Sequence, residues 1–245
     1  MRAAGYLRYE LLRTVRNRRF LVFSLGFPLV LYFLIAGPNK DQHDFGGSGL
    51  DAPLYYMVGL MAFGTMNGML STGARIAGER QVGWNRQLRI SPLSARGYLG
   101  TKVVTAYAMA CTTIAVMSLS GVSLGVRLSA GHWVRMLAMI LVGLVPFAAG
   151  GILLGHMVTS DSAGPALGGI TSLLALVSGT WFPIGDSGVI HDVAQVLPSY
   201  WLVQAAHVGV GGNGWGGTGW TVIAVWSAAL AWLAARAYRR DTGRV

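Results

Sequence analysis

Long apolar stretches separated by short polar segments dominate the chain. Six of them contain no Asp, Glu, Lys or Arg: Phe20–Asn39, Tyr55–Ala74, Val103–Val126, Met136–Ser160, Ser162–Gly185 and Val193–Ala235. A helix needs roughly 20 apolar residues to cross about 30 Å of hydrocarbon, whereas runs of about 10–14 suit buried core helices. The pattern therefore predicts an all-α integral membrane protein with six transmembrane helices. We place them at about 20–36, 54–74, 98–124, 133–157, 163–182 and 218–237.

Composition indicates the same class. Hydrophobic residues make up 53% of the chain and charged residues 11%, whereas soluble domains carry about 25% charged residues. So little charge cannot cover the surface of a soluble domain. The sequence shows no internal repeat, which gives no support to a carrier built from inverted repeats.

The basic residues predict the orientation of the chain in the membrane. Nearly all of them lie in three clusters: the first 19 residues, residues 75–102, and the segment from residue 236 onwards. With six spans, all three clusters fall on one side, which the positive-inside rule makes cytoplasmic. We therefore expect a multi-pass protein of the cell inner (plasma) membrane with both termini in the cytoplasm. The net charge of +10 then reflects topology, and no nucleic-acid partner is expected.

Two segments outside the spans have patterns of their own. Before the first span, apolar residues recur at helical spacing: Ala4, Leu7, Leu11 and Val15. They predict an amphipathic helix on the inner membrane surface; a disordered basic leader is the alternative. In residues 183–219, Pro198 separates pieces of about 10 residues, which are too short to span. We expect a short outer re-entrant pair of helices there.

Motifs for chemistry are mostly absent from the sequence. The chain has no G-x-x-x-x-G-K-[ST], no H-E-x-x-H and no C-x-x-C, and Cys111 is its one cysteine. We therefore expect no catalytic residue and no metal site. His156 and His207 have no carboxylate at helical spacing, so both are interpreted as structural. Four G-x-x-x-G pairs, which begin at Gly64, Gly121, Gly151 and Gly164, predict close helix packing.

The inner loop predicted over residues 75–97 carries the most informative motif. Residues 78–92 read GERQVGWNRQLRISP. This segment resembles the E-R-x-x-G-x-x-x-x-L-x-x-x-P pattern of permease subunits of type 2 (ABC-2) ATP-binding-cassette transporters. The basic first helix, the six spans and the late outer segment with Phe182-Pro183 and Leu197-Pro198 resemble that family too. Gln81 departs from the pattern, because an acid is common there.

The resemblance implies a single ABC-2 type transmembrane domain over residues 1–245. In that family two six-span subunits pair, as a homodimer or heterodimer, and a separate P-loop ABC ATPase binds ATP and Mg. No cofactor is then expected in this chain. The loop after the second span would form a coupling helix that docks on the ATPase. The ATPase-coupling residues implied are Glu79, Arg80, Gly83, Trp84, Arg86, Leu88 and Pro92.

Two features leave alternatives open. Glu79 is a candidate to pair with a basic group on the ATPase or with a neighbouring arginine, and a solvated basic face is the alternative explanation for the arginines of the loop. Candidate substrate-path residues in the second span are Tyr55, Tyr56, Met61, Phe63 and Asn67. Such soft apolar side chains suit a hydrophobic or amphipathic cargo, but they also suit helix packing or lipid contact.

The function expected from the resemblance is therefore that of an ABC exporter permease. It would move a drug-like, lipid-like or glycan-linked substrate out of the cytoplasm, using ATP hydrolysed by a separate subunit. The alternatives are an ATP-independent carrier or channel, and a structural protein of membrane assembly. A neighbouring reading frame that encodes a P-loop ATPase would favour the transporter.

Overall fold

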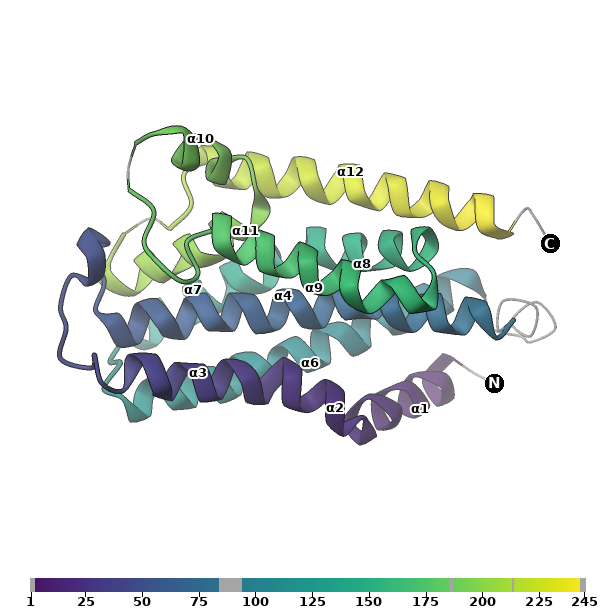
Figure 1. The fold of residues 1–245 in the computed structure, drawn as a ribbon, viewed down its shortest axis with the longest axis horizontal. Helices are drawn as coiled ribbons and strands as arrows, with labels where there is room; N and C mark the ends of the chain where they lie inside the picture. The colour runs from purple at the N-terminus through teal and green to yellow at the C-terminus, as the bar shows by residue number, and fades with distance from the viewer. Residues whose placement is uncertain (1–2, 84–93, 186, 213, 243–245) are drawn as a thin grey trace.

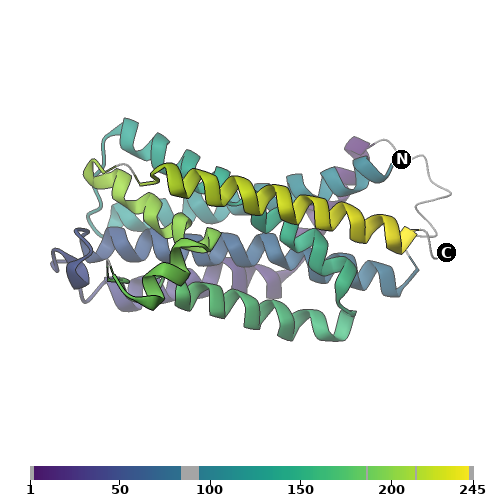
Figure 2. The same ribbon diagram turned by 90° about the horizontal axis from the view of Figure 1, so that it is seen from above.

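The chain folds into an elongated bundle of helices that run roughly along one axis (Figure 1). The computed structural model describes residues 3–83, 94–185, 187–212 and 214–242. These residues form helices and loops without a β-strand, which confirms the all-α prediction for this part of the chain. Both chain ends lie at one end of the bundle, and the loop between α3 and α4 lies at the other (Figures 1 and 2).

The helices follow the predicted spans closely. In chain order they are α1 (Ala3–Arg16), α2 (Arg18–Leu21), α3 (Phe27–Ala36), α4 (Ala52–Gln81), α6 (Ala95–Ser123), α7 (Ala130–Gly143), α8 (Val145–Met157), α9 (Ser160–Val177), α10 (Val189–Gln195), α11 (Pro198–Gln204) and α12 (Gly217–Thr242). A π-helical turn, Val22–Gly26, joins α2 to α3 just before Pro28. Proline cannot donate the backbone hydrogen bond that a regular helix needs, so the helix is irregular at this point.

Three helices of the described chain are long and apolar enough to cross a membrane: Gly97–Ser123, Ala130–Met157 and Gly217–Asp241. A shorter apolar helix runs over Ser24–Ala36. These features indicate a multi-pass membrane protein. The count of six spans stays a prediction, because α4 and α9 are not among these three candidates.

Helix α4 forms the centre of the bundle and packs against α3, α6, α8 and α9 (Figure 1). Glycines bring it close to α8: a Cβ atom added at Gly151 would lie 2.5 Å from the Met69 carbonyl oxygen, and one at Gly73 would lie 2.6 Å from the Gly151 oxygen. Added Cβ atoms at Gly164 and Gly168 would meet nothing within 4 Å. The pair that begins at Gly151 thus supports close helix contact, and the pair that begins at Gly164 faces open space.

The segment after α9 contains two short helices, α10 and α11, at the end of the bundle away from the termini (Figure 1). Pro198 begins α11. The first N–H groups of a helix have no partner within the helix, so the missing N–H of proline costs no hydrogen bond there. Tyr200, Trp201 and Leu202 are buried, because α11 packs against α4, α7 and α12. Entry of this pair into the outer leaflet stays a prediction.

Helix α1 packs on α6 through a face that differs from its apolar stripe. Tyr6, Glu10 and Thr14, spaced four residues apart, are buried, and Val15 of the predicted stripe is 58% exposed. Residues four apart lie on one side of a helix, so α1 presents a mixed polar and aromatic face to the protein. The exposed Val15 remains available to a membrane surface, and the predicted interfacial position of α1 stays a prediction.

Candidate functional site

A buried network of charges lies where α1, α4 and α6 meet, at the end of the bundle that carries both termini. We call it the charge cluster; its members are Glu10, Arg13, Arg75, Glu79, Tyr98 and Lys102. Lys102 is its centre, with 0% exposure. Its Nζ donates hydrogen bonds of 2.6 Å to Glu10 Oε1 and 2.6 Å to Glu79 Oε1. One cation therefore connects α6 to both α1 and α4.

Glu79 is the carboxylate that accepts the most hydrogen bonds in the cluster. Its Oε1 also accepts from Arg13 Nη1 at 2.8 Å, and its Oε2 accepts from the Tyr98 hydroxyl at 2.6 Å. Tyr98 and Lys102 lie one turn apart on α6, so both reach the same carboxylate. Buried charges are stable only when they are paired and hydrogen-bonded, and this carboxylate satisfies both conditions.

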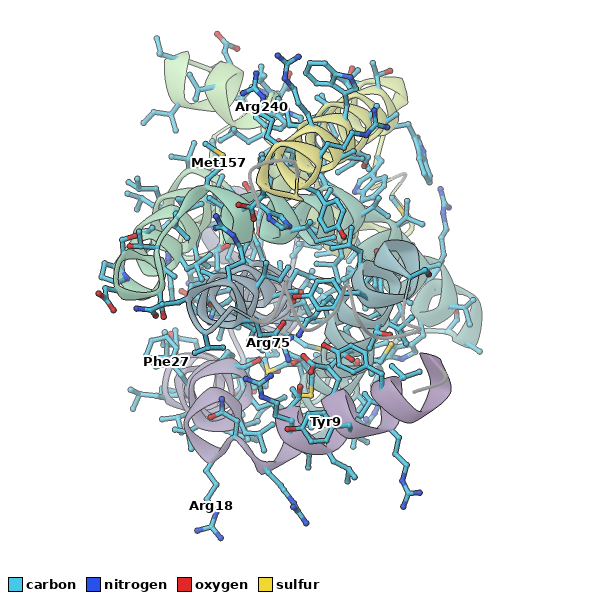
Figure 3. All side chains as sticks on the ribbon, turned by 90° about the vertical axis from the view of Figure 1, so that its right-hand side faces the viewer. Tyr9, Arg18, Phe27, Arg75, Met157 and Arg240 are labelled. Atoms are coloured by element: carbon cyan, nitrogen blue, oxygen red, sulfur yellow. The ribbon has the colours of Figure 1, made fainter. Side chains whose placement is uncertain are left out.

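The two arginines complete the cluster from α1 and α4. Arg75 Nη1 donates to Thr14 Oγ1 at 2.6 Å and lies 3.9 Å from Glu10 Oε1. Partial burial acts to lower the pKa of Arg13, but the carboxylates of Glu79 and Glu10 outweigh it, so that pKa is raised. Figure 3, viewed from this end, shows Arg75 between α1 and the centre of the bundle.

Arg80, the next residue of α4, engages the opposite side of the bundle. Its Nε lies 2.5 Å from Asp241 Oδ2, and its Nη2 donates to Asp241 Oδ1 at 2.9 Å. Its Nη1 donates to the Gly155 carbonyl oxygen of α8 at 2.9 Å, and His156 Nδ1 lies 2.9 Å from Asp241 Oδ2. Adjacent helical residues point about 100° apart. Glu79 and Arg80 therefore connect α4 to α1 and α6 on one side and to α8 and α12 on the other.

The structure places only part of the predicted coupling set. Glu79, Arg80 and Gly83 are described, whereas the others lie outside the described residues: Trp84, Arg86, Leu88 and Pro92. Helix α4 continues to Gln81, so the first seven residues of the loop predicted over 75–97 are helical. Gly83 has φ of +72°, a left-handed conformation that favours glycine at a helix end. The coupling role of these residues stays a prediction.

The candidate substrate-path residues are distributed along α4. Tyr55, Tyr56 and Met61 are buried, and Phe63 and Asn67 are half-buried. Tyr55 donates a hydrogen bond to the Gly179 carbonyl oxygen and lines a cavity of about 370 Å³ at the end away from the termini. Four of the five residues are not among those that line this cavity, so their part in a substrate path stays a prediction.

Sequence reasoning missed seven residues of the two ion-pair sites: Glu10, Arg13, Arg75, Tyr98, Lys102, His156 and Asp241. A signal for Glu10 exists, because it is the one acid among the first 40 residues. It also stands four residues from both Tyr6 and Thr14. His156 was interpreted as structural for want of a carboxylate on its own helix. Its carboxylate comes from α12 instead.

The described chain is thus a helical multi-pass membrane protein whose buried charges gather at one end, beside the basic loop of the sequence motif. Comparison with known proteins specifies the class further. Residues 45–237 match the family described as "ABC-2 family transporter protein". The chain belongs to this family, which confirms the resemblance of the loop motif.

A relative from Bacillus subtilis (strain 168) agrees with this assignment. The chain is 29% identical to the "Putative transport permease YvfS" over 198 residues, which cover 78% of each protein. The family match begins at residue 45, so α1 and its Glu10 precede the matched region. The chain is thus a transport permease subunit rather than a catalytic one.

Proposed function

We propose that this chain is the membrane subunit of an ABC exporter in the cell inner membrane, and that the end carrying both termini is cytoplasmic. A separate P-loop ATPase would bind ATP and Mg, and a second permease subunit would complete the translocation path. The cargo would be hydrophobic or amphipathic: drug-like, lipid-like or glycan-linked. The family membership and the basic character of this end support the proposal.

Six spans are proposed. Helices α2 and α3 together form the first, α4 the second, α6 the third, α7 and α8 together the fourth, α9 the fifth and α12 the sixth. With this assignment, α4 ends and α6 begins at the end of the bundle that carries the termini (Figure 2). An ATPase docked there would act on the C-terminal end of α4. Because α4 lies at the centre of the bundle, a displacement of this end reaches helices on every side.

The observation that carries the coupling proposal is the opposed engagement of Glu79 and Arg80. A force applied just beyond Gln81 meets two ion-pair sites in the last turns of α4. These contacts hold α1 and α6 on one side and α8 and α12 on the other, so the force moves the helices together rather than unwinding the end of α4. Buried contacts of this kind have few alternative arrangements, which suits a two-state transmission of motion.

The test uses the permease reconstituted with its ATPase in proteoliposomes. Glu79→Gln and Gly83→Trp should each lower substrate-linked ATP hydrolysis and transport by about tenfold or more per inserted permease. Glu79→Gln should also lower the thermal midpoint, because Lys102 and Arg13 lose a charged partner. Ser48→Trp, in the loop at the other end of the bundle, is the control and should leave transport unchanged. The permease alone should hydrolyse no ATP. Normal transport by both loop-end variants at normal abundance would remove the coupling assignment.

A further inference from the structure

A cavity of about 350 Å³ opens between α8 and α12 at the end of the bundle that carries both termini. Its volume lies within the range of about 300–1,000 Å³ that is typical of small-ligand sites. Met157 of α8 and Arg240 of α12 both line it, and Figure 3 shows them near each other on the same side of the molecule. The coupling proposal uses the Arg80–Asp241 contact in its wall but assigns no ligand to the cavity.

The charge of the lining favours an anion. Arg80, Arg236 and Arg240 contribute three guanidinium groups, and Asp241 contributes one carboxylate. Arg80 forms a two-pronged contact with Asp241, so these two charges compensate each other. Arg236 and Arg240 are exposed and lie one turn apart on α12, so both can turn toward a shared ligand. Two positive charges of the lining are left over, and they would match a phosphate group.

A buried histidine provides a second, independent observation. The side chain of His156 is 1% exposed and lines the cavity. Its Nδ1 contacts Asp241, but its Nε2 has no hydrogen-bond partner among the described residues. Buried polar atoms in native proteins are rarely left without a partner. Because the Asp241 carboxylate accepts from Nδ1–H, Nε2 of the neutral ring is an acceptor, and a hydroxyl of a ligand headgroup would supply its donor; a phosphate oxygen would bind Nε2–H of the doubly protonated ring.

The remaining wall distinguishes a lipid from a small soluble anion. Leu153, Met157 and Leu233 line the cavity beside the arginines. Helix α12 is the least buried of the span candidates, with 17% of its apolar window buried, so this wall adjoins a surface that lipid tails cover. An apolar wall next to a basic rim suits an acyl chain attached to a phosphate headgroup.

We propose that this cavity binds the phosphate headgroup of an anionic phospholipid from the leaflet at this end of the bundle. Basic pockets between membrane helices on the cytoplasmic side bind acidic headgroups by the same chemistry. The leaflet is the cytoplasmic one if the proposed orientation holds, whereas the site itself does not depend on it. Since Arg80 and Asp241 form the contact between α4 and α12, an occupied site also stabilises that contact.

The experiment measures lipid binding to the purified full chain in a neutral detergent. Phosphatidylglycerol, phosphatidylcholine and sodium phosphate are titrated separately, with native mass spectrometry and the thermal midpoint as readouts. Phosphatidylglycerol should stay bound and raise the midpoint, and the other two should not. Arg236→Gln combined with Arg240→Gln should weaken phosphatidylglycerol binding about thirtyfold, since each basic residue contributes about 1 kcal/mol, or about fivefold.

Two further variants make the result specific. Lys40→Gln combined with Arg127→Gln removes the same number of charges at the other end of the bundle and should leave binding unchanged. Ala237→Trp fills the cavity without removing a charge and should abolish binding, which keeps the test valid if the arginine variant fails to fold. Equal binding of phosphatidylcholine, equal loss in the control variant, or full binding by Ala237→Trp would overturn the proposal. Stabilisation by sodium phosphate alone would assign the site to a free anion instead.

Discussion

Replacement of Lys102 by methionine tests whether the charge cluster is a paired, buried network. Lys102 has no exposed surface, and its Nζ lies 2.6 Å from one carboxylate oxygen of Glu10 and 2.6 Å from one of Glu79. Methionine has a similar length and no charge, so it fills the space and removes only the cation. The Glu10 side chain has 0% exposure and cannot recover its lost partner from water.

The expected destabilisation follows from the partners that remain. Removal of one member of a buried ion pair costs about 3–5 kcal/mol. Arg13 and Arg75 stay within 3.8 and 3.9 Å of Glu10, and Glu79 keeps Arg13 and Tyr98. These contacts place the cost at the lower limit, about 3 kcal/mol. For a chain of this size, the thermal midpoint should fall by about 6–12 °C.

The assay is thermal unfolding of the purified protein in detergent, followed by intrinsic tryptophan fluorescence. Lys40→Met, an exposed lysine at the other end of the bundle, should leave the midpoint unchanged. Adding Glu10→Gln to Lys102→Met should recover about half of the loss, because it removes the carboxylate that lost its partner. A midpoint for Lys102→Met within 1–2 °C of wild type would show that the cluster is hydrated or rearranged, and the reasoning would be refuted.

Two other predictions test packing and topology. Gly151→Ala should destabilise the protein by about 1–3 kcal/mol, because its Cβ would lie 2.5 Å from a backbone oxygen of α4. Gly164→Ala, which meets nothing within 4 Å, should be neutral or stabilising by up to about 1 kcal/mol; equal thermal shifts would contradict the packing assignment. With Cys111 replaced, a cysteine at Ser48 should react with an impermeant thiol reagent added to intact cells, and one at Ser94 only after lysis. Labelling of Ser94 from outside would reverse the proposed orientation.

The sequence predicted the helices well because their signal is local. An apolar stretch, a proline or a run of glycines acts on the residues next to it, so the helices could be located within a few residues. Helix α4 differs most, since it continues seven residues beyond the predicted span to Gln81. The predicted span ended at residue 74 because charged residues follow it. In the structure the charge cluster pairs Arg75 and Glu79, so the helix continues through them.

The partners of the charged residues could not be predicted, because they are far apart in the sequence. Glu10 and Lys102 are separated by 92 residues, and Arg80 and Asp241 by 161. No periodicity within one helix indicates which residue of another helix will face it. The one-sided spacing of Tyr6, Glu10 and Thr14 shows a polar face on α1, but its meaning depends on Lys102 of α6.

The order of the two charges in the motif has a geometric reason. Neighbouring residues on a helix point about 100° apart, so an acid followed directly by a base can contact two different sides of a bundle from a single turn. Glu79 uses this position to bind cations of α1 and α6, and Arg80 uses it to bind the carboxylate of α12. Both side chains are therefore engaged within the chain. We infer that the direct contact with an ATPase falls to the segment after Gln81, and that the two charges pass its movement to both halves of the bundle.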